Sequence, residues 1–184
     1  MKQIAVVLIL LALIAAAGLW YALRPRPVEE RLTPAQIQKM PFTQLFDLAG
    51  QCEAHTFDAN CTLIFEVMAL KSQHAKEGEK FWVTQMLRLG DWYIYAGTRD
   101  WKPGSPDAPE VKKALEVFDW VYENKPFYGD GALIGRARLY NSKYNPAWAA
   151  AHRAEAKDAY AKLQKRYPAA PYATEATAAL NSLR

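Results

Sequence analysis

The sequence predicts an all-α protein in which one N-terminal transmembrane helix is followed by a domain of helical hairpins. Three observations lead to this prediction. Residues 4–23 contain no charged side chain, apolar residues farther along recur at helical spacing, and no segment shows the sustained alternation that is typical of a strand. We therefore expect a short tail at 1–3, a membrane anchor at 4–23, a linker at 24–33 and a helical domain at 34–184.

The N-terminal apolar segment is long enough to cross a bilayer. As a helix it spans about 30 Å, which matches the thickness of the hydrocarbon core. Trp20 and Tyr21 lie at its downstream end, where such rings favour the headgroup boundary. The alanines at 15–17 also fit a signal-peptidase site, with Lys2 as the charged start of a signal peptide. Because the apolar run continues to Leu23, beyond that site, an uncleaved anchor is the preferred interpretation.

The cysteines and the basic residues give opposite predictions for the side of the membrane. Cys52 and Cys61 are an even pair in a small domain behind an export-like segment, which predicts a disulfide in an oxidising compartment. Arg24, Arg26 and Arg31 follow the anchor, and the positive-inside rule alone would place them in the cytoplasm. We expect a single-pass protein of the bacterial inner membrane, in contact with its lipid, with the C-terminal domain in the periplasm.

Capping residues, prolines and glycines divide the domain into short helices. A proline at 41 interrupts the first helix, Gly50 is expected to end the second, and Asp107 is expected to cap a helix that starts at Pro109. Residues 98–109 and 125–131 are expected to be loops because they are rich in proline and glycine. The expected helices cover 34–40, 41–48, 60–76, 81–96, 109–124, 132–140, 146–166 and 172–183.

Two segments of the domain share one spacing at an offset of 42 residues. A small residue is followed by an aromatic residue four positions on. An aliphatic residue comes three positions after the aromatic one, and a proline five positions after the aliphatic one. The small residue allows a neighbouring helix to approach closely, and the two larger side chains fill the groove between helices. The proline ends the helix. The residues are Ala114, Phe118, Val121 and Pro126 in the first segment, and Ala156, Tyr160, Leu163 and Pro168 in the second.

This spacing resembles the second helix of a tetratricopeptide repeat. Residues 165–173, KRYPAAPYA, are also similar to the YPxSPYA junction of periplasmic tetratricopeptide proteins that act in envelope assembly. The resemblance covers residues 80–184 and implies that 80–97 pairs with 109–124, that 132–140 pairs with 146–166, and that the helix from 172 is a terminal cap. The Trp-x2-Leu-Gly-x2-Tyr signature of a first helix is missing from 132–140, and the period of 42 exceeds the usual period of about 34.

No motif for catalysis, a cofactor or nucleic-acid binding is present. The net charge is +4, and basic residues are interleaved with acidic ones rather than forming a block. Cys52, His55, Cys61 and His74 could in principle hold a metal, but their spacing matches none of the usual zinc motifs. His74 and His152 lie among charged residues and are expected to be solvated. We therefore expect no catalytic, cofactor or metal residues.

Aromatic residues are the remaining signal for function. Most of the tryptophans and tyrosines between 82 and 148 are expected to be core residues. The candidates for a partner-binding surface are Trp92, Trp101, Phe127, Tyr128 and Trp148.

Three classes of function fit these features. The first is a non-enzymatic scaffold, assembly factor or accessory subunit that binds another membrane or periplasmic protein. The second is a domain that binds or hydrolyses peptidoglycan or another glycan in an aromatic-lined cleft. The third is a single-span subunit of a large membrane complex, with its anchor packed on other helices through the small residues at 15–18.

Overall fold

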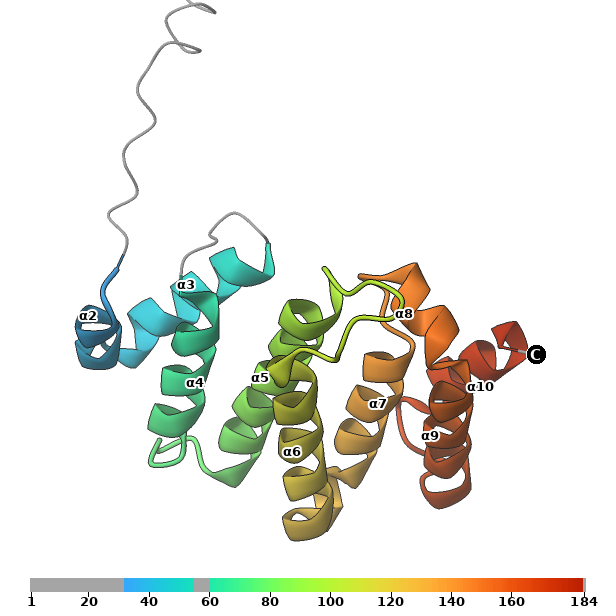
Figure 1. Cartoon of the computed structure of the whole chain (residues 1–184). Helices are drawn as coiled ribbons and strands as arrows, with labels where there is room; N and C mark the ends of the chain where they lie inside the picture. Colours follow the sequence, from blue (N-terminus) through green and yellow to red (C-terminus); the bar gives the residue numbers. More distant parts are fainter. Residues whose placement is uncertain (1–31, 55–59, 184) are drawn as a thin grey trace, which may run out of the picture. The chain divides into compact units, whose positions relative to one another are not determined.

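The structure, a computed structural model, describes residues 32–54 and 60–183. Within these ranges it contains nine α-helices and one short 3-10 helix, and no strand (Figure 1). The all-α prediction is therefore confirmed. In the same ranges no helix is both long enough and apolar enough to cross a membrane. The predicted tail at 1–3, the predicted anchor at 4–23 and all but the end of the predicted linker lie outside the described residues.

The first two helices are α2 (Pro34–Lys39) and α3 (Phe42–Glu53). Thr33 and Gln36 form the capping box that starts α2, as their spacing predicts. The predicted end of the second helix at Gly50 is wrong, because α3 continues for three more residues. A glycine inside a helix costs only about 1 kcal/mol, and the buried side chains of Ala49 and Cys52 hold this last turn against the core.

A disulfide joins the end of α3 to the start of α4 (Cys61–Ser72). Cys52 and Cys61 are both buried, so the predicted covalent pair is present inside the core. Asn60 precedes α4 in the left-handed conformation, with φ of 62°. Its side-chain amide donates a hydrogen bond to the carbonyl of Leu32 at 2.6 Å, which fixes the chain entering α2 beside the start of α4.

Helix α5 (Glu79–Thr98) and helix α6 (Pro109–Asn124) pack on each other, as the resemblance implies. Helix α6 has the predicted bounds, but Ala108 is its N-cap and makes no side-chain hydrogen bond, so the predicted cap at Asp107 is wrong. Glu66 of α4 connects the neighbouring helices, since it accepts hydrogen bonds from Tyr93 of α5 at 2.6 Å and Lys113 of α6 at 3.1 Å.

Helix α7 (Gly129–Tyr140) follows the 3-10 turn η1 (Pro126–Tyr128) and begins three residues earlier than predicted. It contacts both α6 and α5. The ring of Phe118, which is 1% exposed, lies between two glycines. A Cβ atom at Gly90 of α5, or at Gly135 of α7, would come within 2.5 Å of a ring carbon of Phe118. The absence of a side chain at both positions allows the three helices to pack this closely.

The predicted helix at 146–166 is instead two helices, α8 (Pro146–Ala151) and α9 (Arg153–Arg166). His152 separates them with a non-helical backbone, φ −110° and ψ 26°. Its imidazole stacks on the indole of Trp148, with 3.9 Å between the ring centroids, and its Nδ1 lies 3.0 Å from the carbonyl of Trp148. His152 is therefore partly buried in an aromatic cluster, which corrects the prediction that it is solvated.

The last helix, α10 (Ala173–Ser182), packs on α9, and α9 packs on α7 (Figure 1). One cluster of buried side chains runs from α2 to the start of α8, and a second lies between α7, α9 and α10.

The residues of the predicted repeat occupy matching places in α6 and α9. In both helices the small, aromatic and aliphatic residues are buried and the proline is exposed. Both helices also end in the same way. The residue before the proline has φ near −130° and ψ near 60°, and its amide donates a 2.8 Å hydrogen bond to Val121 or Leu163.

Candidate functional site

The described residues form an open groove of about 650 Å³. Helix α5 supplies most of one wall, including Arg88, Asp91 and Tyr95. The other residues that line it come from the end of α3, from α4, from α7, from the segment that follows α7, from α9 and from α10. They are Glu53, Phe65, Trp92, Ile94, Arg138, Asn141, Lys143, Tyr144, Tyr160 and Glu175.

Two arginines of the groove are held by carboxylates from other helices. Arg88 donates to Glu53 at 3.0 Å and also to Gln85 at 3.1 Å. Arg138 binds Glu175 through two parallel hydrogen bonds of 2.9 and 2.6 Å, the bidentate geometry that makes such pairs strong. Hydrogen bonding to Arg138 lowers the pKa of Glu175, so this carboxylate stays ionised. These pairs link α3 to α5 and α7 to α10 across the groove.

Asp91 differs from the other two acidic residues of the groove. Among the described residues it makes no hydrogen bond and no ion pair. Burial raises its pKa to about 6, although the nearby charge of Arg138 acts in the opposite direction. The side chain nevertheless remains accessible to water. The residue is exposed, so its carboxylate lines the open groove and is not enclosed by it.

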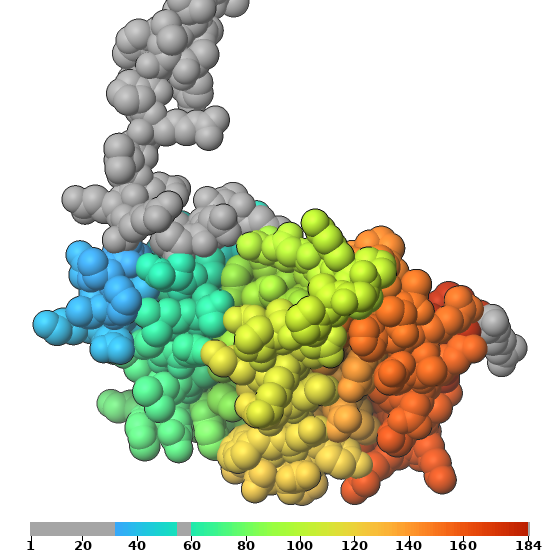
Figure 2. Space-filling view, in the orientation of Figure 1, coloured from blue at the N-terminus to red at the C-terminus, as the bar shows by residue number. Residues whose placement is uncertain are grey.

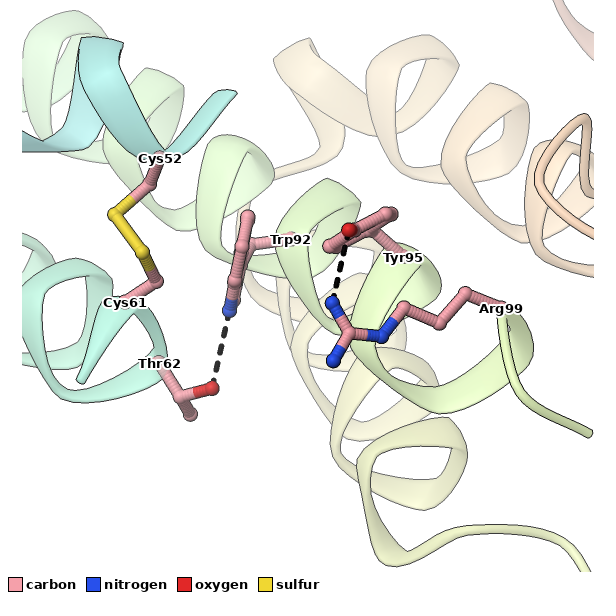
Figure 3. The surroundings of a disulfide bond; sticks show 6 residues. All are labelled: Cys52, Cys61, Thr62, Trp92, Tyr95 and Arg99. Atoms are coloured by element: carbon pink, nitrogen blue, oxygen red, sulfur yellow. Dashed lines mark hydrogen bonds between the residues drawn. A yellow bond between two sulfur atoms is a disulfide. The ribbon is translucent and has the colours of Figure 1, made fainter. Parts of the chain in front are cut away.

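Aromatic rings form much of the remaining surface. Trp92 stacks on Phe65 at 5.2 Å and lies 5.0 Å from Tyr95, which in turn contacts Tyr144 edge to face at 5.0 Å. The indole of Trp92 donates to Thr62 at 3.0 Å and lies next to the disulfide (Figure 3). The hydroxyl of Tyr95 accepts a hydrogen bond from Arg99 at 2.8 Å (Figure 3). Trp92 is 9% exposed, so it supports the wall more than it offers contact area.

A second, more apolar hollow of about 530 Å³ shares Arg88 with the groove. Phe46 of α3 and Phe81 of α5 line it, and Phe46 is one of the few large apolar side chains that are exposed. The guanidinium of Arg88 lies 4.9 Å from the Phe46 ring and separates the apolar hollow from the charged groove. The two hollows together offer an apolar part and a charged part to one extended ligand.

Trp148 does not face solvent, so we remove it from the partner-binding candidates. Its side chain is 0% exposed and its indole donates to the carbonyl of Leu139 at 2.8 Å. Trp101, from the loop between α5 and α6, packs edge to face against Trp148 at 5.3 Å. Figure 2 shows this loop, in yellow-green, lying against the orange segment that contains α8.

A buried asparagine fixes this junction. The amide nitrogen of Asn145 donates to the carbonyls of Thr98 and Trp101, each at 2.8 Å. Its side-chain oxygen caps α8 by accepting from the backbone amides of Ala147 and Trp148 at 3.0 and 3.1 Å. The loop at 99–108 is therefore tied to the segment at 141–152, and Trp101 contributes mainly to this structural contact.

Phe127 and Tyr128 lie at the other end of α6. Phe127 is 87% exposed in the 3-10 turn, and Tyr128 is half-buried beside it with 5.3 Å between the rings. Trp101 precedes the N-terminal end of α6, whereas Phe127 follows its C-terminal end. The five aromatic candidates are thus not brought together. Of the five, only Trp92 lines the groove, and Phe127 remains exposed at a separate place.

The charged residues of the groove were not among the candidates from sequence. Asp91 and Arg88 were detectable in principle, because they are charged positions in a stretch from Phe81 to Ala96 that is otherwise largely apolar. Arg138 and Glu175 carried no such signal. They are ordinary helix-surface residues until α10 packs on α9 and brings Glu175 to Arg138.

The disulfide excludes the alternative metal site. Both sulfur atoms are bonded to each other, so neither is a thiolate ligand. His55 lies outside the described residues, and within those residues no three His, Cys, Asp or Glu side chains are grouped to hold a metal ion.

No known family model, curated protein or solved structure matches this chain.

Proposed function

We propose that this chain is a membrane-anchored helical-repeat protein that binds a segment of another envelope protein in the groove between α5, α7 and α10. It would act as a scaffold, an assembly factor or an accessory subunit rather than as an enzyme. The observation that carries the proposal is the groove itself, an open surface with aromatic walls, two fixed ion pairs and one carboxylate that lacks an ionic partner among the described residues. Such a surface suits an extended peptide better than a small molecule, which prefers a more enclosed and more apolar site.

The relation to tetratricopeptide repeats is part of this proposal. Leu89, Gly90 and Tyr93 of α5 have the Leu-Gly-x2-Tyr spacing of a first helix, and Ala114, Phe118 and Pro126 continue with that of a second helix. The extra length of the 42-residue offset from Ala114 to Ala156 falls in the segment at 141–152, and the loop at 99–108 lengthens the first pair in the same way. The long period is then compatible with two repeats that each carry an insertion.

The proposed location rests on the sequence. The apolar segment at 4–23 is expected to anchor the chain, and a disulfide between buried cysteines favours the periplasm because disulfides persist in oxidising compartments. Alkaline extraction of native membranes tests the anchor, since an anchored chain stays in the pellet. Modification of single cysteines introduced into a Cys52→Ala/Cys61→Ala chain, with a reagent that does not cross the membrane, tests the side.

Site-specific photo-cross-linking in the native host tests the proposed role of the groove. A photoreactive phenylalanine derivative replaces Tyr144, which lines the groove, or Lys112, whose side chain is 83% exposed in an ion pair with Glu116 on α6. We expect one reproducible protein adduct from position 144 and none from position 112. Equal adducts from both positions, or no adduct from position 144 and a second groove position, would contradict the proposal.

A glycan-binding or hydrolytic domain is the second candidate. The observation that favours it is the pair of carboxylates in an aromatic-lined groove whose pKa values shift in opposite directions, Asp91 upward and Glu175 downward. Sedimentation of the protein with purified peptidoglycan, followed by analysis of released fragments, tests this candidate. Binding that is lost on substitution of Tyr144, or fragment release that is lost in the Asp91→Asn variant, would favour it over the protein-binding proposal.

A further inference from the structure

The charges of the groove are unevenly satisfied. Arg88 is held by Glu53, and Arg138 is held by both oxygens of Glu175. Asp91 lies among these groups with no hydrogen bond or ion pair to any described residue. Asp91 is exposed in the groove, and the charges of Arg138 and Lys143 act on it without a hydrogen bond or an ion pair. An incoming cation can therefore pair with its carboxylate directly.

We infer that Asp91 is the recognition group for a basic side chain, arginine or lysine, on the protein segment that occupies the groove. The inference rests on the proposed function and identifies the chemistry of the partner at that site. A guanidinium or ammonium group would neutralise Asp91 and form a charge-assisted hydrogen bond with it. The partner is thus expected to present an extended segment with a basic residue placed to reach the floor of the groove.

The carboxylate of Asp91 and the pairing of both arginines favour a cation over an anion beside Asp91, although Lys143 also lines the groove. An anionic ligand would have to compete with Glu53 and Glu175 for arginines that are already paired, and it would approach Asp91 with the same charge. A neutral ligand would cover Asp91 without compensating its charge, which is costly because the carboxylate would lose water and gain no ionic partner. The rings of Tyr95 and Tyr144 lie along the same groove and can pack against the apolar stem of a long basic side chain.

The adjoining hollow extends the description of the partner. Phe46 and Phe81 line an apolar hollow that adjoins the groove on the other side of Arg88. An apolar residue on the same segment can occupy this hollow while the basic residue reaches Asp91. The expected recognition element therefore combines one basic and one apolar side chain on an extended backbone.

This recognition depends on pH because only the ionised form of Asp91 attracts a cation. Binding should weaken as the pH falls through about 6, the pKa to which burial raises Asp91. The other charged or titratable groups that face Asp91 or share the groove with it are Glu53 of α3, Arg88 of α5, Arg138 of α7, Lys143, Tyr160 of α9 and Glu175 of α10. An Asp91→Asn variant keeps all of these groups, so pH dependence that it retains belongs to them and not to Asp91.

The test uses the full chain in nanodiscs, panned against a phage library of random linear peptides at pH 7.5. Three proteins are compared: the wild type, Asp91→Asn, and a matched control, Glu116→Gln, which removes one carboxylate from the exposed face of α6. We expect the wild type and the control to enrich the same peptides, with an arginine or lysine at a fixed distance from an apolar residue. For a synthetic peptide from the enriched set, Asp91→Asn should weaken binding by about 10- to 100-fold, as expected for a hydrogen bond to a charged group. The wild type should bind about tenfold more weakly at pH 5 than at pH 7.5.

Two kinds of result would overturn the inference, and they differ in what they say about the groove. Enrichment of peptides without a basic residue, or equal enrichment by Asp91→Asn, would show that the groove binds peptides without using Asp91 in this way. The proposed function would then stand. If no peptide is enriched by the wild type over empty nanodiscs, both the inference and the proposed groove function fail. Circular dichroism of each variant confirms that the comparison is made between folded proteins.

Discussion

The contact of Phe118 with Gly90 and Gly135 predicts that adding one methyl group at position 135 destabilises the domain. The Cβ of a Gly135→Ala variant would lie 2.5 Å from the ring Cζ of Phe118, about 1 Å closer than two carbon atoms normally approach. The ring cannot turn away easily, because Gly90 limits its other side and the side chain is almost completely buried. Overpacking of this kind costs about 1–3 kcal/mol.

Gly50 provides the matched control for this prediction. It also lies within a helix, α3, but a Cβ added there meets no atom within 4 Å. A Gly50→Ala variant should gain about 0.5–1 kcal/mol from helix propensity alone. Gly135→Ala receives the same gain, so the free energy of unfolding of the two variants should differ by the overpacking cost of about 1–3 kcal/mol.

Urea unfolding of residues 32–184, followed by circular dichroism, measures both variants. A Phe118→Leu substitution shortens the side chain, so in the double variant it should remove most of the cost of Gly135→Ala, and a double-mutant cycle gives the coupling. If the two variants have equal free energies of unfolding, the Phe118 ring has room to move, and α5, α6 and α7 do not pack as closely around it as the Gly90 and Gly135 contacts indicate.

Three further predictions concern the disulfide, the groove and the α8 junction. A Cys52→Ala/Cys61→Ala variant should lose about 2–3 kcal/mol of stability by loop entropy. Under reducing conditions the urea midpoints of the wild type and the variant should become equal. If the midpoints still differ, the stability is lost through packing of the two side chains and not through the disulfide. Asp91 has a pKa that folding raises to about 6, so it binds a proton more readily in the folded state, and wild-type stability should fall as the pH rises from about 4 to about 6. Asp91→Asn should lack this fall and be the more stable protein at pH 7.5; parallel pH profiles for the two proteins would contradict the assigned pKa. Asn145→Ala should cost about 2–4 kcal/mol, because α8 loses its cap and two buried carbonyls lose their donor. Limited proteolysis should then cut the loop at 99–108 faster than in the wild type, and an unchanged cleavage rate would show that Asn145 does not hold this loop.

Local signals predicted the helices best where they do not depend on distant neighbours. The proline at 109 and the polar turn after Asn124 fix the bounds of α6, and the Thr33–Gln36 capping box fixes the start of α2. The predictions failed where a tertiary contact outweighs a local preference. Helix α3 continues past Gly50 because its last turn carries buried residues. The helix predicted at 146–166 breaks at His152, whose imidazole stacks on Trp148 in the aromatic cluster.

The groove shows the same division. The aromatic residues that build its wall were visible as a concentration of large rings, but burial of Trp148 and the separation of Trp101 from Phe127 were not. A pattern of side chains along one helix says which face is apolar. It does not say which residue from another helix will cover that face.

The sequence by itself determined the all-helical class, most helix positions and the pairing of the two cysteines, because periodicity, capping and an isolated cysteine pair are properties of short stretches of chain. The tertiary structure decided which charges meet. Arg138 becomes the partner of Glu175, and Asp91 has no ionic partner among the described residues, only when α5, α7 and α10 line one groove. The energy of a charge depends on the groups and the water within a few ångströms of it, and folding sets that environment.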